Sequence, residues 1–183
     1  LSAKRKIVPF ISVKFKNNIE KLCSFYVSDW HLVTMLLPYI NKQINEKANI
    51  ITILEKGIEE NIRTLIKKLN LKNEEKILNI NWKSSNGIKY SELKEKMSEL
   101  ENKDKLNVVF INGSKNYINL TNKNIEKFLK DNSKKYKEVN IKIINCFEVS
   151  EFNINMPEIL HAHDRILNTS GEKEIQDVFE GYA

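Results

Sequence analysis

The stretch Ile50-Ile-Thr-Ile-Leu54 is an unbroken run of apolar and β-branched residues. A strand with apolar side chains on both faces is typical of a parallel sheet that is covered by helices on each side. Other runs with a similar composition recur along the chain. We therefore expect strands over residues 7–13, 22–27, 49–54, 77–80, 106–111 and 139–147.

The segments between these runs carry apolar residues at helical spacing. Ser28 and Asp29 suit the N-terminal cap of the first helix, which we expect to extend to residue 44. Strands that alternate with helices predict one three-layer α/β/α domain, residues 1–183, with a mostly parallel sheet. Further helices are expected over residues 58–69, 90–100, 118–136 and 157–167, with a short one closing the chain.

The chain is basic, but its positive charge comes almost wholly from lysine. The formal net charge is +6, with 27 Lys and 3 Arg. Sequence-specific readers of nucleic acid depend on Arg for bidentate contacts, so we interpret most of the charge as a solvated surface. The charge is uneven, because residues 1–22 are basic whereas residues 146–183 hold eight acids and two bases.

Cysteine usage and hydropathy indicate a cytoplasmic protein. Cys23 and Cys146 both lie inside apolar runs, which is usual for free thiols in a core. The most apolar stretch, residues 32–40, is shorter than the ~20 residues that a membrane helix needs. We also expect no signal peptide, because no apolar segment follows the basic N-terminus.

The sequence lacks the motifs of common enzyme chemistry. Neither GxxxxGK[ST] nor GxGxxG occurs, and Gly113-Ser114-Lys115 offers a single glycine for a phosphate cradle. On a helix, the imidazoles of His161 and His163 would point in nearly opposite directions, so they could not share a metal ion. We therefore expect a binding site without a catalytic residue, a metal or a cofactor.

Two blocks of sequence, one near each end of the domain, carry a more specific pattern. The first is Lys21-Leu-Cys-Ser-Phe-Tyr26 followed by Leu37-Pro-Tyr39, and the second is Ile144-Asn-Cys-Phe-Glu148 followed by Ile159-Leu-His-Ala-His163. Together they resemble the MEDS family, the methanogen and methylotroph sensory domain. The positions that match the family pattern are Cys23, Tyr26, Pro38, Cys146 and His163, and those that depart from it are Lys21, Phe147, Glu148 and Asp164.

The resemblance implies a RecA-like fold without a phosphate loop over residues 20–171. It also implies a non-enzymatic sensory domain that binds a small molecule in a bacterial signalling pathway. In an open parallel sheet, ligands bind beyond the carboxyl ends of the strands. We expect the ligand-binding residues there to be Tyr26, Ser28, Asp29, His31, Glu148 and His163.

Within this predicted site, Tyr26 would form an aromatic wall with a polar tip. Asp29 and His31 would orient a polar group of the ligand. The alternative is that Ser28 and Asp29 only cap the helix that follows them.

Three other functions stay open. The chain is a degenerate RecA-type nucleotide-binding protein if Lys56, Lys83 or Lys115 replaces the missing loop lysine. It is a nucleic-acid-binding module if the basic N-terminal segment binds phosphates. It is a protein-interaction module if the acidic tail from Glu172 docks a signalling partner or a second copy in a homodimer.

Overall fold

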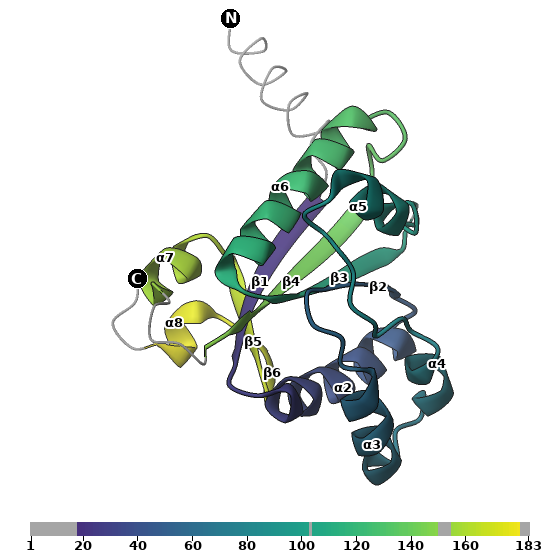
Figure 1. Cartoon of the computed structure of the whole chain (residues 1–183), viewed down its shortest axis with the longest axis vertical. Helices are drawn as coiled ribbons and strands as arrows, with labels where there is room; N and C mark the ends of the chain where they lie inside the picture. The colour runs from purple at the N-terminus through teal and green to yellow at the C-terminus, as the bar shows by residue number, and fades with distance from the viewer. Residues whose placement is uncertain (1–17, 103, 150–154, 180–183) are drawn as a thin grey trace, which may run out of the picture.

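The computed structural model describes residues 18–102, 104–149 and 155–179 of the chain. The strand expected over residues 7–13 and most of the basic N-terminal segment lie outside the described residues. Within them, six strands form one sheet (Figure 1). The strands are β1 (Asn18–Tyr26), β2 (Asn49–Leu54), β3 (Leu106–Gly113), β4 (Asn140–Glu148), β5 (Arg165–Asn168) and β6 (Gly171–Lys173).

The strands follow the order β2-β3-β4-β1-β5-β6 across the sheet. Strands β1 to β5 run parallel, and β6 pairs antiparallel with β5. In the centre of the sheet, β1 aligns with β4 from Asn18 opposite Asn140 to Tyr26 opposite Glu148. The helices are α2 (Asp29–Asn45), α3 (Glu59–Leu69), α4 (Glu74–Leu78), α5 (Tyr90–Met97), α6 (Lys115–Asp131), α7 (Met156–His161) and α8 (Ile175–Val178).

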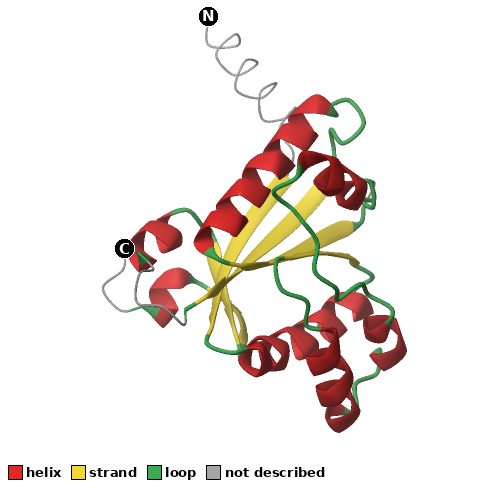
Figure 2. Cartoon of the chain, in the orientation of Figure 1, coloured by secondary structure: helices red, strands yellow, loops and turns green. Residues whose placement is uncertain are grey.

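Helices cover both faces of the sheet (Figure 2). Side chains alternate along each strand, so Leu22 and Tyr26 of β1 belong to one core cluster and Cys23 belongs to the other. Buried residues of α2, α3 and α4 complete the first cluster, on what we term the α2 face. Those of α5, α6, α7 and α8 complete the second, on the α6 face. The predicted α/β/α domain with a mostly parallel sheet is confirmed.

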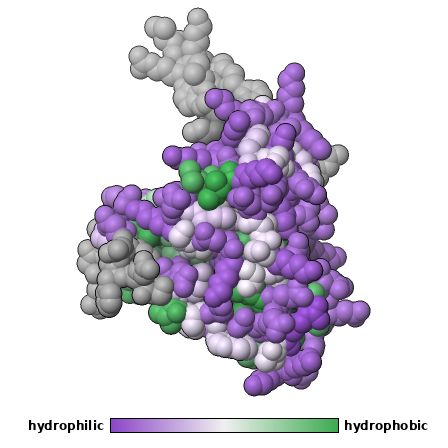
Figure 3. All heavy atoms as spheres, in the orientation of Figure 1, coloured by the Kyte–Doolittle hydropathy of each residue, from purple (hydrophilic) through white to green (hydrophobic). Residues whose placement is uncertain are grey.

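The surface that Figure 3 shows is mainly hydrophilic, with hydrophobic residues in small patches. In the described parts of the chain, no helix is both long enough and apolar enough to cross a lipid bilayer. Residues 32–40 lie within α2, where Leu32, Leu36 and Ile40 are buried against the sheet.

The strand expected over residues 77–80 is wrong, because Ile77 belongs to the short helix α4. Glu74 and Glu75 occupy the first turn of this helix, where acidic side chains complement the positive end of the helix dipole. Ile77 is then buried in the core of the α2 face. An apolar run of only four residues fits one buried helical turn as well as a strand.

The helix expected over residues 157–167 is also wrong in its second half. It ends at His161, and Arg165–Asn168 forms β5 instead. Ile166 fills the core of the α6 face and Leu167 that of the α2 face, which is the alternation of a strand. The strand expected over residues 139–147 is therefore followed along the chain by two further strands, β5 and β6.

The turn after β5 explains why the chain reverses there. The backbone N–H of Ser170 donates to Asn168 Oδ1 at 2.8 Å, and Gly171 has a φ of 100°. The chain then returns as β6. Helix α6 is also shorter than expected, because the side-chain amide of Asn132 donates to Phe128 O at 2.9 Å and ends the helix at Asp131.

Candidate functional site

The connection from β1 to α2 lies at the carboxyl edge of the sheet, where the sequence predicts the site. Ser28 Oγ accepts the backbone N–H of His31 at 3.1 Å and so caps α2. The ring Nδ1 of His31 accepts the backbone N–H of Val27 at 3.2 Å. Val27 and Ser28, the two residues of this connection, therefore both bind His31 in the first turn of α2, and Ser28 has the capping role that the sequence offers as the alternative.

Two other predicted residues of this edge are also engaged by the protein itself. Tyr26 is 1% exposed and points to the α2 face. Burial is the largest cause that raises the pKa of its phenol, so Tyr26 stays neutral at physiological pH. Asp29 forms an ion pair with Lys56 at 2.9 Å, and the hydrogen bond that the Lys56 ammonium group donates to Asp29 raises the pKa of Lys56.

The N-terminus of α6 already holds a carboxylate from the protein. The backbone N–H of Ser114 donates to Glu55 Oε1 at 2.8 Å, and Ser114 Oγ accepts the N–H of Tyr117 at 3.2 Å. Glu55 thus occupies the place that an anion would take at this helix end. Lys115 forms an ion pair with Glu158 at 2.8 Å.

His163 belongs to a polar chain on the other face of the sheet. Its Nδ1 lies 2.6 Å from Ile159 O, and its Nε2 lies 3.0 Å from Asn145 Nδ2. A carbonyl oxygen only accepts, so Nδ1 carries the proton and Nε2 accepts from the Asn145 amide. The Asn145 side chain in turn accepts from Asn122 Nδ2 at 2.9 Å. Burial is the largest effect on His163 and lowers the pKa of its imidazole.

The six predicted residues therefore do not meet in one cavity. Tyr26 points to the α2 face, whereas His163 contacts Asn145 and Phe147 on the α6 face. Glu148 is the exposed last residue of β4, opposite Tyr26 in the sheet register.

A cavity of about 410 Å³ lies instead between α2 and the β5–β6 hairpin. Because β5 runs parallel to β1, the turn of this hairpin lies at the carboxyl edge of the sheet. None of the six predicted site residues lines the cavity. Its polar wall includes Tyr39 and Lys42 of α2, Arg165 of β5, Thr169 and Ser170 of the turn, and Glu172 of β6.

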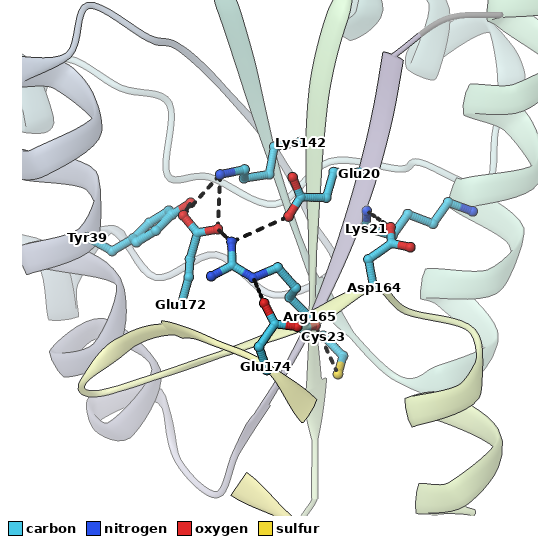
Figure 4. A network of polar contacts seen from close by, with 9 residues as sticks. All are labelled: Glu20, Lys21, Cys23, Tyr39, Lys142, Asp164, Arg165, Glu172 and Glu174. Carbon is cyan, nitrogen blue, oxygen red and sulfur yellow. Dashed lines mark hydrogen bonds and ion pairs between the residues drawn. The ribbon is translucent and has the colours of Figure 1, made fainter. Parts of the chain in front are cut away.

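A network of polar side chains adjoins this cavity, and its members Tyr39, Arg165 and Glu172 line it (Figure 4). Glu172 is its centre: Oε1 accepts from Lys142 Nζ at 3.0 Å and from Arg165 Nη1 at 2.9 Å. Oε2 accepts from Lys142 at 3.0 Å and from the Tyr39 hydroxyl at 3.1 Å. Burial first, and then the Glu172 carboxylate, raise the pKa of the Tyr39 phenol. Each oxygen of Glu172 thus has two donors from the protein.

The two cationic residues that line the cavity differ, because Arg165 is paired with three carboxylates and Lys42 with none of the described ones. Arg165 contacts Glu20 at 3.7 Å through Nη1 and Glu174 at 3.3 Å through Nε. The ammonium group of Lys42, in contrast, makes no ion pair with a described residue. The cavity therefore offers positive charge and hydroxyl groups to a ligand. The carboxylate of Glu172, which also lines the cavity, already has hydrogen-bond donors from the protein on both oxygens.

The sequence reasoning missed this site. The sequence predicts a helix over residues 157–167, and this expectation hides the hairpin that brings Arg165 to Glu172. The segment Asn168-Thr-Ser-Gly171 between two short runs was the available signal, because such residues favour a hairpin turn.

The two cysteines are buried on opposite faces of the sheet, so the prediction of core thiols is confirmed. Burial raises the pKa of Cys23 to about 12 and also raises that of Cys146. Both groups stay protonated and are poor nucleophiles at neutral pH. Within the described residues, no group of three or more His, Cys, Asp or Glu side chains has an arrangement that would hold a metal ion.

No family model, curated protein or solved structure matches this chain, so the assignment of function depends on the geometry described above.

Proposed function

We propose that this domain is a non-enzymatic sensory module that binds a small anion in the cavity between α2 and the β5–β6 hairpin. The observation that carries the proposal is the unequal commitment of the charges there. Glu172 accepts four hydrogen bonds from Lys142, Arg165 and Tyr39, whereas Lys42 makes no ion pair with a described residue. The cavity therefore presents an ammonium group without an ion-pair partner among the described residues, beside a carboxylate that already has its donors.

The ligand class follows from these donors. The Lys42 ammonium and the hydroxyls of Thr169 and Ser170 can donate hydrogen bonds to anionic oxygen atoms. A carboxylate and a phosphate share this chemistry. A cavity of about 410 Å³ falls within the range of small-molecule sites.

A binding role rather than catalysis is supported by the state of the reactive side chains. Cys23 and Cys146 are buried thiols, and His163 is fixed at both ring nitrogens by Ile159 and Asn145. The alternative of a degenerate nucleotide site has less support, because Lys56 and Lys115 are ion-paired. A cytoplasmic location is part of the proposal and is supported by two free, buried thiols.

The proposal is tested by NMR titration of the ¹⁵N-labelled protein with succinate, with inorganic phosphate and with glycerol as the neutral control. We expect one or both anions, but not glycerol, to shift the amide signals of residues 168–172. Larger signal shifts with succinate than with phosphate would indicate a carboxylate ligand, and the reverse would indicate a phosphate ligand. Signals that move only around residues 26–31 would place the site at the edge that the sequence predicted.

A matched pair of lysine variants makes the test specific. Lys42→Met removes the ammonium group but keeps the alkyl chain, and we expect it to weaken anion binding about tenfold. Lys68→Met makes the same change on α3, away from the cavity, and leaves the affinity unchanged. Equal affinities in the two variants would reject the cavity as the site.

A further inference from the structure

We propose that the exposed face of α6 binds the phosphate backbone of a double-stranded nucleic acid without reading its sequence. Lys123, Lys127 and Lys130 are exposed on this helix, and we term them the lysine row. None of the three forms an ion pair with a described residue. Because α6 and α2 cover opposite faces of the sheet, this surface is separate from the anion cavity, and either proposal can fail alone.

The spacing of the lysine row suits a phosphate backbone. Residues at positions i, i+4 and i+7 share one face of a helix, so the three ammonium groups follow the axis of α6. The helix rises by about 10 Å from the first to the last, which corresponds to about three phosphates along one strand of a duplex. The composition alone predicts a solvated surface, whereas the fold gathers these lysines in a line.

The charge around the lysine row is positive overall. Residues 115–138 contain seven lysines and three acidic residues. One of the acids, Glu126, is paired with Lys21 at 3.3 Å, and the other two are Asp131 and Glu138. The lysines of this segment therefore outnumber its carboxylates, and a neighbouring strand compensates one of those carboxylates.

Helix α5, which lies beside α6 (Figure 1), adds to this charge. Its Lys94 lies 5.5 Å from the centre of the Tyr90 ring, and Lys127 of the lysine row lies 4.2 Å from the same ring. Glu92 and Glu95 of α5 instead line a cavity that lies between this helix and the start of the loop before it. The side of α5 that meets the lysine row therefore carries a lysine.

A duplex fits this surface better than a single strand does. Single strands bind largely through bases that stack on aromatic side chains. Among the exposed large hydrophobic residues of the described chain, the one aromatic is Trp30, which belongs to α2. Tyr90 lies beside the lysine row, but two ammonium groups contact its ring and its hydroxyl donates to Asp131 at 2.9 Å. Lysines as point charges hold phosphates without identifying bases.

A lipid bilayer is a poorer partner, although it is also anionic. A helix that lies in a membrane interface inserts an apolar face between the lipids. The apolar residues Ile118, Ile125, Phe128 and Leu129 of α6 are buried in the protein core. The helix could therefore meet a membrane only through its charge.

The chain brings further positive charge to the same end of the molecule. Residues 1–17 contain five basic residues and no acidic residue. They join the sheet at Asn18, whose backbone N–H donates to Val139 O at 3.3 Å, directly after the turn that follows α6. Lys134 in that turn is exposed. This concentration of charge strengthens the field that attracts a polyanion.

The test measures the binding of the full chain to fluorescein-labelled duplexes by fluorescence anisotropy. The probes are a DNA duplex of about 20 base pairs, or two helical turns, and an RNA duplex of the same sequence. We expect the logarithm of the affinity to fall linearly with that of the salt concentration between about 50 and 200 mM, with a slope of about −3 or steeper. A DNA duplex with the same bases in another order should bind equally well. The two backbones show which kind of duplex is preferred.

Matched double variants assign the binding to the lysine row. Lys123→Ala/Lys130→Ala removes two charges and keeps α6, because alanine is the best helix former. We expect the salt slope to become shallower by about two and the affinity at low salt to fall at least about tenfold. Lys67→Ala/Lys68→Ala makes the same change on exposed positions of α3 and should leave both quantities unchanged.

Three outcomes would overturn the proposal. The first is that neither duplex binds at about 50 mM salt. The second is an unchanged salt slope in Lys123→Ala/Lys130→Ala, which would move the binding away from α6. The third is co-sedimentation of the protein with phosphatidylglycerol vesicles but binding to neither duplex. Circular dichroism checks that each variant is folded, and Lys123→Arg/Lys130→Arg, which keeps the charge, should bind like the wild type.

Discussion

Lys142 on β4 and Glu172 on β6 form an ion pair at 3.0 Å although two strands, β1 and β5, separate them in the sheet. Their side chains are only 13% and 17% exposed. The pair lies under α2 on the same face as Tyr39, which also donates to Glu172 (Figure 4). It therefore ties the short hairpin to the centre of the sheet.

Removing the carboxylate of Glu172 should destabilise the fold strongly. In Glu172→Gln, the largely buried ammonium group of Lys142 loses its carboxylate partner, and Arg165 loses one of its three. We expect the free energy of unfolding to fall by about 3 kcal/mol. Urea denaturation followed by circular dichroism measures the change.

Glu174→Gln is the matched control for this experiment. Its carboxylate also contacts Arg165, at 3.3 Å, but its side chain is 52% exposed. An exposed pair contributes little, so we expect a change within about 1 kcal/mol. If the two variants lose the same stability, the central role assigned to Glu172 is wrong.

The long strands of this fold were predictable from the sequence, and the short ones were not. The runs at residues 49–54 and 139–147 are apolar on both faces, and the structure places β2 and β4 there. The run at residues 77–80 is four residues long and predicts a strand where the structure has α4, and the helix expected over residues 157–167 includes most of the four-residue strand β5. A run of that length becomes a strand or a helix according to its tertiary contacts.

The site was less predictable than the fold. The sequence predicts Ser28 as a ligand-binding residue and offers its role as a helix cap as the alternative, which is visible there because capping depends on residues close in sequence. The cluster around Glu172 depends instead on the order of the strands, which brings Lys142 and Tyr39 to it from distant segments. No local pattern encodes such a contact.

Gly113 should be intolerant of a side chain, because β3 and β2 approach closely at their carboxyl ends. Its φ is 142°, and an added Cβ would lie 2.7 Å from the Cβ of Glu55. We expect Gly113→Ala to lower the free energy of unfolding by about 2 kcal/mol or more. Gly171→Ala shares a positive φ of 100° but meets no atom within 4 Å, so its loss should be smaller. Thermal unfolding measures the stability of both variants. A lower melting temperature for Gly171→Ala than for Gly113→Ala would contradict this account.

The two thiols should be unreactive in the folded protein. Cys23 and Cys146 are buried, and burial raises both pKa values, that of Cys23 to about 12. We expect no reaction with Ellman's reagent near neutral pH until guanidinium chloride unfolds the chain. Ser170→Cys places a thiol in the exposed hairpin turn and provides the positive control. Rapid labelling of the native wild type would show that a thiol is accessible.

His163 should make the stability of the fold depend on pH. Burial holds the pKa of its imidazole below the usual value of about 6.5. The ammonium group of Lys21 also lowers this pKa, whereas the carboxylate of Asp164 raises it. As the pH falls below about 6.5, the unfolded chain binds a proton that the folded protein resists. The free energy of unfolding therefore decreases towards the folded pKa and stays constant above the unfolded one.

The hydrogen bonds of His163 explain why the proton is resisted. An imidazolium has only donors, so its Nε2 could no longer accept from the Asn145 amide. Turning that amide over would present an oxygen to His163 but would break the bond that Asn145 accepts from Asn122. We expect His163→Gln, which does not titrate, to have a flatter stability curve than the wild type between about pH 5 and 7. An NMR titration of the His163 ring with a midpoint at or above about 6.5 would contradict this mechanism.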